Sequence, residues 1–341
     1  FIAMFLIISE IYLFLFRTHV KLGNRHKLSV GTEYIVDVLK SQTDNIAKED
    51  AYTLALFAQD EIKLLRNLQA LIGVRYIYHE NFKNHATPNV ALMYKPGKFN
   101  FRASYAAGFR TPTLSELYAT DIAKKNDRLT IGNLDLKPEK NNYFSLSAEY
   151  VHERFSVSVN AFYNNIRDMI DYNTIATGDK AMEQYGHKEV RQRDNIAEAK
   201  VHGINVSANA YLGAGFNLSG GYTHLNTQDV ELEQPIDKSI KNAYNINAQW
   251  AHSWKIYRLN INLNGRINSK RFSKSYGYAP EYQLWDLNTR HSFNLKSVII
   301  EPGFGMENLF DYMDDRPYNS NYATLTPGRS FYISLSLKFK S

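Results

Sequence analysis

The sequence has no cysteine, only 9 prolines, and no apolar run long enough for a membrane-spanning helix. Without cysteine, disulfide bonds, thiolate nucleophiles and cysteine-ligated metals are excluded. The mean hydropathy of -0.41 excludes a bundle of transmembrane helices, each of which needs about 20 consecutive apolar residues. It does not exclude a membrane β-barrel, in which only alternate residues face lipid. Aromatic residues make up 13% of the chain, which argues against disorder.

The sequence also contains no cluster of residues with the same charge. The formal net charge is +6, but Lys and Arg are scattered and form no dense block. A solvated surface of mixed charge explains this pattern, and without a basic stripe we expect no nucleic-acid partner. The signatures H-E-x-x-H and G-x-S-x-G and a glycine-rich phosphate loop are all missing. We therefore expect no enzyme, no bound metal and no cofactor.

Alternation of apolar and polar residues is the strongest positive signal. In Tyr257–Asn268 the odd positions are apolar or Gly, and every even position is Arg or Asn. Successive side chains of a β-strand point to opposite faces, so such a segment has one apolar and one polar face. About 14 segments of this kind are predicted. Their approximate spans are 26–38, 52–65, 68–80, 88–95, 99–110, 141–153, 155–172, 196–213, 215–227, 241–253, 256–271, 282–294, 298–310 and 331–340.

The connections between these segments alternate in length. Short connections are predicted at 66–67, 96–98, 153–154, 213–215, 253–255 and 295–297. Longer ones are predicted at 39–51, 80–88, 111–140, 173–195, 228–240, 272–281 and 311–330. Tight turns then lie at one end of the sheet and long loops at the other, as in outer-membrane barrels. The polar face is rich in Asn, Ser, Thr and Tyr, which suits a hydrated or plugged lumen. A soluble sheet packed on a core is the competing interpretation.

Two parts of the chain depart from this pattern. Residues 1–16 are nearly all apolar, interrupted only by Ser9 and Glu10, and they lack the basic region and cleavage site of a signal peptide. We treat 1–25 as a separate apolar segment, either an extra strand or a fragment edge, ahead of a barrel region at 26–341. Short helices are expected within the loops at 45–51 and 179–193.

Two motifs frame the longest predicted loop. The first, GFRTPTLSELY at 108–118, contains Phe109, Arg110 and Pro112. The second, GNLDLKPEK at 132–140, contains Asn133, Asp135, Leu136, Pro138 and Glu139. They resemble the G-F-R-A-P-S-L-x-E-L-Y and G-N-P-D-L-K-P-E-K boxes of TonB-dependent outer-membrane receptors. The segments NIAEAKVHGIN at 195–205, ENLFD at 307–311 and PGRSF at 327–331 resemble later landmarks of that family, in the same order.

This resemblance implies an all-β, antiparallel up-and-down transmembrane barrel of 22 strands, of which this chain supplies about the last 14. The family's N-terminal plug and TonB-contacting box have no counterpart here, so we expect a piece of a longer protein or a truncated gene product. The implied partners are the TonB-ExbB-ExbD complex, which acts through the plug, together with lipid and lipopolysaccharide of a Gram-negative outer membrane.

The implied function is TonB-driven uptake of a scarce micronutrient, and a ferric siderophore is the favoured ligand. Haem and cobalamin are alternative ligands. Haem-uptake members carry a ligating His between the two boxes, whereas residues 113–131 contain none, which weakens the haem interpretation. A barrel that does not transport actively, such as an adhesin, a porin or a truncated remnant, is the alternative class of function. A barrel enzyme that uses Asp314 or Asp315 is a third interpretation, and it is less favoured.

The candidate ligand contacts are Arg, Tyr and His residues of the predicted long loops. Arg110 ends a strand, where it would meet an anionic ligand, a lipopolysaccharide phosphate or a loop carboxylate such as Glu116. An ion pair within the rim is the favoured interpretation for Arg110. Aromatic residues with Arg suit a planar, anionic catecholate chelate through stacking and cation–π contacts. The other candidates are Tyr118, Tyr185, His187, Arg271, Tyr276, Tyr278, Arg316, Tyr318 and Tyr322.

Overall fold

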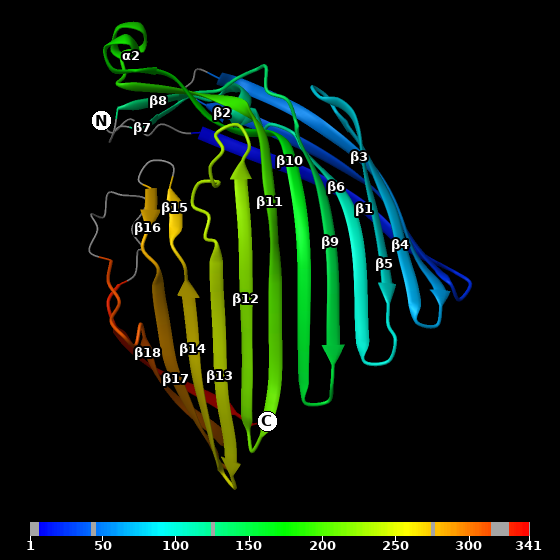
Figure 1. Cartoon of the computed structure of the whole chain (residues 1–341), viewed down its shortest axis with the longest axis vertical. Helices are drawn as coiled ribbons and strands as arrows, with labels where there is room; N and C mark the ends of the chain where they lie inside the picture. Colours follow the sequence, from blue (N-terminus) through cyan, green and yellow to red (C-terminus); the bar gives the residue numbers. More distant parts are fainter. Residues whose placement is uncertain (1–6, 42–45, 124–126, 274–276, 315–326, 341) are drawn as a thin grey trace.

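The computed structural model shows a single curved wall of long antiparallel strands (Figure 1). It describes residues 7–41, 46–123, 127–273, 277–314 and 327–340. The main sheet has 17 strands, of which β7 and β8 are short strands of a loop region, leaving 15 strands in the wall. The prediction of an all-β, up-and-down antiparallel fold is confirmed. The wall has more strands than the 14 expected because it also includes β1.

The wall strands are 10 to 25 residues long, so each reaches the roughly 9–11 residues that a tilted membrane strand needs. In chain order they are β1 (Ile7–Leu22), β2 (His26–Ser41), β3 (Ile46–Leu65), β4 (Leu68–His79), β5 (Lys83–Tyr94), β6 (Phe99–Arg110), β9 (Glu139–Val151), β10 (Phe155–Thr177), β11 (Glu189–Gly213), β12 (Phe216–Asp229), β13 (Asn242–Trp254), β14 (Tyr257–Asn268), β17 (Tyr282–Asn294), β18 (Val298–Glu307) and β19 (Ser330–Phe339). The remaining elements are α1 (Leu114–Tyr118), β7 (Asp121–Ala123), β8 (Arg128–Ile131), α2 (Gly178–Tyr185), β15 (Arg271–Ser273) and β16 (Gly277–Ala279).

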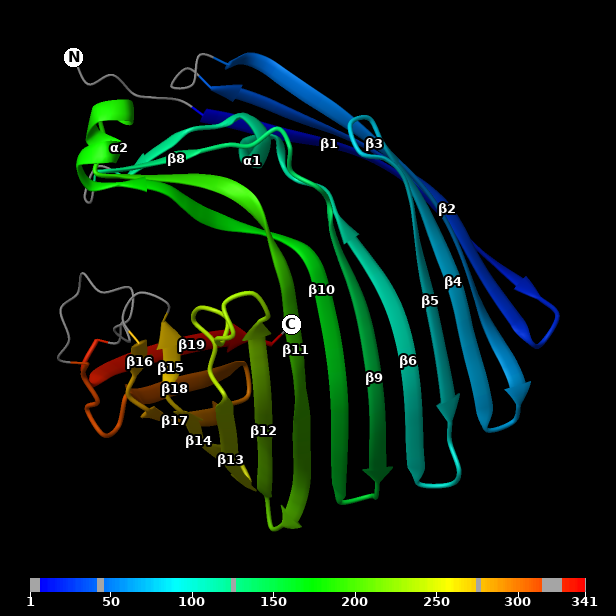
Figure 2. The same ribbon diagram turned by 45° about the horizontal axis from the view of Figure 1, so that its top comes forward.

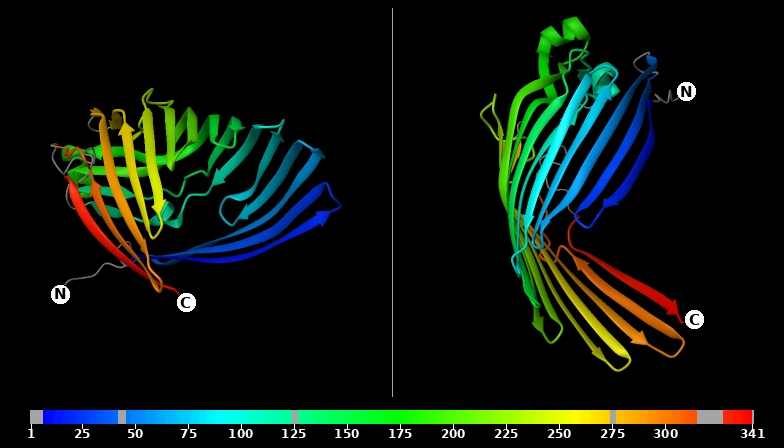
Figure 3. Two further views of the ribbon diagram at one scale, coloured as in Figure 1. Left: turned by 90° about the horizontal axis from the view of Figure 1, so that it is seen from below. Right: turned by 90° about the vertical axis from the view of Figure 1, so that its right-hand side faces the viewer.

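Each wall strand pairs with the strands before and after it in the wall, and the wall does not close. β1 pairs only with β2, and β19 pairs only with β18, among the residues that the structure describes. Figures 2 and 3 show the resulting curved wall, with β1 and β19 at its two free edges. An open edge exposes unpaired backbone donors and acceptors to any further strand. Phe331, Ile333 and Phe339 of β19 are 69%, 78% and 81% exposed, as befits an edge strand.

The two rims of the wall differ, as the connection lengths predict. The short-turn rim carries the tight connections, including Arg66-Asn67 and the turn between Gly213 and Phe216. The long-loop rim carries α2 and the hairpins β7–β8 and β15–β16 (Figure 1), and α1 lies at the same rim (Figure 2). Three connections at the long-loop rim are shorter than the expected 39–51, 80–88 and 173–195, because the strands extend into them: β3 begins at Ile46, β5 at Lys83 and β11 at Glu189. β6 pairs with β5 only from Asn89 onward, so Pro88 lies where a missing donor is tolerated.

The two faces of the wall divide apolar from polar residues. On β10, Val157 and Val159 are exposed on the convex face, and Ser156 and Ser158 are half-buried on the concave face. Concave side chains bond across strands: the hydroxyls of Ser158 and Ser207 lie 2.7 Å apart. Further hydrogen bonds of this kind join Ser104 to Ser145 and Asn247 to Asn262. The structure thus has an apolar outside and a hydrogen-bonding inside.

The predicted loop helices are only partly correct. Residues 46–51 form the start of β3, because the register with β2 extends along them, so the helix expected at 45–51 is wrong there. The helix expected at 179–193 is limited to α2, because Gly186 takes a left-handed φ of 72° and β11 begins at Glu189. Neither described helix is long and apolar enough to cross a membrane.

Candidate functional site

Arg110 joins the ends of two strands to a helix at the long-loop rim. It is the last residue of β6 and lies opposite Glu139, the first residue of β9. Its Nε and Nη2 atoms donate to the two carboxylate oxygens of Glu139 at 2.7 and 2.6 Å. Its Nη1 atom donates to Oε2 of Glu116 in α1 at 3.0 Å. We call Arg110, Glu116 and Glu139 the rim clamp; its paired, charge-assisted bonds are of the strongest type that side chains form.

The charges of the rim clamp stabilise one another. The hydrogen bond to Glu139 raises the pKa of Arg110 above its ordinary value. Burial acts to raise the pKa of Glu139, but hydrogen bonds from Arg110 and from the Ile170 N–H (2.8 Å) lower the pKa overall. The guanidinium of Arg110 is 43% exposed, and its bonds are directed at protein carboxylates. It is therefore engaged within the rim rather than held open for a ligand.

Helix α1 is fixed by a capping box and by packing on the wall. The Thr113 hydroxyl accepts from the Glu116 N–H at 3.2 Å, and Oε2 of Glu116 accepts from the Thr113 N–H at 2.9 Å. Leu114 is buried against Leu39 of β2 and Ala51 of β3, and Tyr118 packs against this cluster. The loop between β6 and β9 therefore reaches the concave side of β3 and β2, which are three and four positions from β6 along the wall. Tyr118 is half-buried as part of this packing.

The second motif is held by two asparagines. Nδ2 of Asn133 donates to the carbonyl of Arg193 at 2.9 Å, and its Oδ1 accepts from the Asp135 N–H at 2.9 Å. Asn195 bonds Lys137 in both directions, accepting from its N–H at 2.7 Å and donating to its carbonyl at 2.9 Å. Leu136 between them is 3% exposed. These bonds attach the loop of residues 132–138 to β11.

A second loop assembly surrounds His187. β8 pairs in parallel with Glu189–Gln192 of β11, extending the wall above the long-loop rim. The imidazole Nδ1 of His187 lies 2.8 Å from Oδ1 of Asp127, and this contact lowers the pKa of Asp127. Tyr185 ends α2 and is half-buried. His187 thus connects the two loops, and no group of three or more metal-ligating side chains occurs in the described parts of the chain.

The other loop candidates are not brought together with these. Arg271 and Tyr278 lie on the two strands of the small β15–β16 hairpin, where Tyr278 is 57% exposed and stacks edge-on against Phe272. Four candidates lie outside the described residues: Tyr276, Arg316, Tyr318 and Tyr322.

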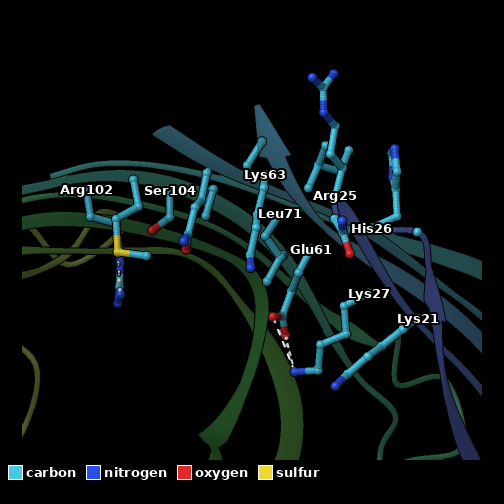
Figure 4. A pocket seen from close by; sticks show the side chains of 16 residues that line it. Lys21, Arg25, His26, Lys27, Glu61, Lys63, Leu71, Arg102 and Ser104 are labelled. Carbon is cyan, nitrogen blue, oxygen red and sulfur yellow. Dashed lines mark hydrogen bonds and ion pairs between the residues drawn. The ribbon is translucent and has the colours of Figure 1, made fainter. Parts of the chain in front are cut away.

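A pocket of about 670 Å³ lies on the concave face near the short-turn rim. Lys21, Lys27, Lys63 and Arg102 line it from four different strands, with one carboxylate, Glu61 (Figure 4). We call these five residues and the space between them the basic pocket. Its floor is largely apolar and includes Ala70, Leu71, Ala91 and Met93. Nζ of Lys27 lies 3.3 Å from Oε1 of Glu61.

The architecture and the motifs agree with a match to a known family. The family described as TonB dependent receptor-like, beta-barrel, matches residues 10–309, which is most of the chain. The chain belongs to the TonB-dependent receptors. Members of this family are outer-membrane proteins that depend on TonB for energy.

Solved structures similar to this receptor include siderophore receptors. A point mutant of the ferric enterobactin receptor PfeA from Pseudomonas aeruginosa is 19% identical, with a TM-score of 0.80 over 98% of this chain and 54% of that one. The siderophore receptor PirA from Pseudomonas aeruginosa is 18% identical, with a TM-score of 0.77 over 99% and 58%. The copper transporter OprC is 12% identical, with a TM-score of 0.75 over 96% and 56%. The receptor chain thus spans little more than half of these structures, and the likeness concerns the fold.

Sequence analysis missed the basic pocket and the role of Asn195. Asn195 stands in a strand motif, but its partner Lys137 is 58 residues away, and no local pattern connects the two. The pocket residues occupy the polar positions of their strands, as strand alternation alone would indicate. Their convergence requires the register across β1 to β6, which periodicity does not supply.

Proposed function

We propose that this protein takes part in the TonB-driven import of an anionic iron chelate of the siderophore class across a Gram-negative outer membrane. The observation that carries the transport function is the family match over residues 10–309. Aromatic and cationic side chains at the long-loop rim support an anionic, aromatic ligand. The guanidinium of Arg193 there lies 4.0 Å from the ring centroid of Tyr172 and forms a cation–π pair with it.

An anionic chelate also suits the charge of the wall. The chain carries a formal net charge of +6, and the lining of the pocket contains five Lys or Arg residues, Arg25 among them, and one carboxylate. A neutral or cationic ligand would gain nothing from this charge, whereas a ferric catecholate would be attracted to it. The ligating His expected of a haem receptor is missing from residues 113–131.

The test is uptake of radiolabelled metal (iron, cobalt or copper, as each probe requires) by cells that carry the protein, in the presence and absence of functional TonB. Ferric catecholate, ferric hydroxamate, haem, cobalamin and cupric ion are supplied in parallel. We expect catecholate-bound iron to enter only when TonB is functional. Uptake that persists without TonB would favour a passive barrel, and preference for haem, cobalamin or copper would overturn the proposed ligand class.

A further inference from the structure

Three cations lie side by side on the convex face, close to the long-loop rim. Lys140 of β9 and Arg167 of β10 are paired directly opposite each other, and both side chains are exposed. Arg167 has the same parity as the convex Val159 of β10, so its side chain points to the convex face. Lys200 of β11 is half-buried on that face, opposite Asn165. We call Lys140, Arg167 and Lys200 the cation row.

The described parts of the chain contain no carboxylate that neutralises the cation row. None forms an ion pair with any of its three members. Glu198 lies opposite Arg167 on β11, but the two are not joined by an ion pair. A comparable cation of the convex face is paired, since Nζ of Lys48 lies 2.9 Å from Oδ1 of Asp50. Like charges opposite each other destabilise a sheet, so the row opposes folding until an anion binds.

The position of the cation row in the wall limits what can cover it. β9, β10 and β11 stand in the middle of the wall, and each is paired on both sides (Figure 1). The convex face also points away from the lumen. Neither the free edges of the wall nor the contents of the lumen therefore account for the uncovered charge.

Aromatic rings mark the level of a membrane interface just below the cation row. Tyr105, Phe144, Tyr163 and His202 lie opposite one another on β6, β9, β10 and β11. The ring centroids of Tyr105 and Phe144 are 4.9 Å apart, and those of Tyr163 and His202 are 6.4 Å apart. Tyrosine rings concentrate where acyl chains meet headgroups. Arg167 follows Tyr163 by four residues toward the long-loop rim, which places the cation row at the level of the headgroups.

Below the rings, the convex face has a mostly apolar groove of about 600 Å³. Large and small side chains alternate along one row of paired residues, which consists of Leu92, Ala103, Leu146, Ala161 and Ile204 on five adjacent strands. The three large side chains are exposed and form ridges, and the two alanines leave furrows between them. An acyl chain in such a furrow contacts a ridge on each side, which adds dispersion attraction.

The spacing of these features indicates the type of lipid. Neighbouring strands lie about 4.8 Å apart, so Lys140 on β9 and Lys200 on β11 are separated by about 10 Å across the wall. A headgroup with two separated phosphates matches this span better than a single phosphate does. The furrows at Ala103 and Ala161 are also two strands apart, so the groove takes more than one acyl chain.

We propose that the convex face of β5, β6, β9, β10 and β11 binds a bisphosphorylated, multiply acylated lipid, the lipid A part of lipopolysaccharide. The cation row binds its phosphates through charge-assisted hydrogen bonds, and the furrows hold its acyl chains. Outer-membrane barrels turn their longer loops outward, so the cation row lies in the outer leaflet. The site does not depend on which ligand the receptor imports.

The test measures lipid binding to the purified full chain in detergent micelles by native mass spectrometry. The lipids are bisphosphorylated lipid A, monophosphorylated lipid A and phosphatidylglycerol. We expect bisphosphorylated lipid A to bind most tightly. The double variant Lys140→Gln/Arg167→Gln should bind it roughly tenfold more weakly, because two cations beside an anionic lipid are lost. Ala161→Trp fills a furrow without changing the charge, and it should weaken the binding of both forms of lipid A.

Two control variants match these changes outside the site. Lys40→Gln/Lys270→Gln removes two exposed lysines near the long-loop rim, at the ends of β2 and β14. Ala208→Trp adds the same ring at an exposed position of β11 outside the groove. Both controls should bind bisphosphorylated lipid A as the wild type does.

Four results would overturn the proposal. The first is that bisphosphorylated lipid A does not bind, and the second is that phosphatidylglycerol binds as tightly. The third is equal affinity of Lys140→Gln/Arg167→Gln and its lysine control, which would show that the cation row does not bind the phosphates. The fourth is equal affinity of Ala161→Trp and Ala208→Trp, which would show that the furrows do not hold the acyl chains.

Discussion

Arg110 is the residue on which the loop between β6 and β9 depends. Its guanidinium holds Glu139 at the start of β9 and Glu116 in α1 at the same time. Glu116 in turn caps α1 through Thr113. Removal of the guanidinium would therefore release the helix and leave two carboxylates near each other. The clamp therefore fixes the position of this loop relative to the ends of β6 and β9.

We expect Arg110→Gln to loosen this loop without unfolding the wall. The clamp is partly exposed, so the loss should lower the free energy of unfolding by only about 1 kcal/mol. Hydrogen exchange of residues 111–123 and 127–138 should accelerate, while exchange in β9 and β10 stays slow. Arg154→Gln, in the turn between β9 and β10, is the control and should change neither. Unchanged exchange of the loop in Arg110→Gln would show that the clamp does not hold it.

Asn195 offers a second test, because aspartate has the same shape. Its Nδ2 donates to the carbonyls of Lys137 and Asp168, and a carboxylate would repel both oxygens. We expect Asn195→Asp to lower the free energy of unfolding by about 1–2 kcal/mol, because two donated hydrogen bonds are lost and the Asp168 carbonyl is part-buried. Urea titration followed by gel mobility measures the change.

Asn205→Asp is the matched control on the same strand. The Oδ1 atom of Asn205 accepts from the Thr223 hydroxyl, and a carboxylate can accept that bond equally well. If Asn205→Asp and Asn195→Asp are equally destabilised, the effect is one of added charge and the role given to Asn195 is wrong.

The sequence predicts only one of the two ion pairs of the rim clamp. A pairing of Arg110 with Glu116 follows from their proximity in the sequence and from opposite charge. The pairing with Glu139 depends on β6 and β9 being neighbours, which the intervening loop of 28 residues conceals. Hydrogen bonds between residues so far apart are fixed by register, so they become visible only once the strands are aligned.

Strand positions follow from alternation wherever one face is apolar and the other polar. β14 and β17 begin and end within a few residues of their predicted limits. Alternation does not detect β1, because Ile11 to Phe16 are apolar on both faces of the strand. Residues 46–51 contain Lys, Glu and Asp in a helix-like composition, but pairing with β2 overrides local preference.

Pairing between β14 and β17 yields a prediction about packing on the convex face. The ring of Trp285 lies over Gly265 on the neighbouring strand, and a Cβ atom at Gly265 would lie 2.5 Å from the ring. We expect Gly265→Val to displace the ring and to lower the free energy of unfolding by about 1–3 kcal/mol, the usual cost of overpacking. Urea titration followed by tryptophan fluorescence measures this.

The control is Gly220→Val, on the convex face of β12. A Cβ atom at Gly220 comes no closer than 3.4 Å to any neighbour. This variant should be close to the wild type in stability. Equal losses in both variants would attribute the effect to strand propensity rather than to the ring of Trp285.

The molecule as a whole is a wall with two differently composed halves on its concave side. Around β1 to β6 the concave face carries the basic pocket, whereas around β13 to β17 it carries amides such as Asn247, Asn260 and Asn262. The convex side is apolar throughout, with Leu146, Leu212 and Leu335 all more than 60% exposed. Such a surface would aggregate in water and is stable only against lipid.

The measurement that tests this account most directly is a nitroxide scan along β10 in lipid bilayers. The chain has no cysteine, so single cysteines introduced at 156–161 can be labelled without background. We predict that labels at Val157, Val159 and Ala161 are reached by oxygen dissolved in the bilayer, and that labels at Ser156, Ser158 and Asn160 are reached by water-soluble nickel chelates. Accessibility that does not alternate, or that alternates with the faces exchanged, would contradict a transmembrane wall with a polar lumen.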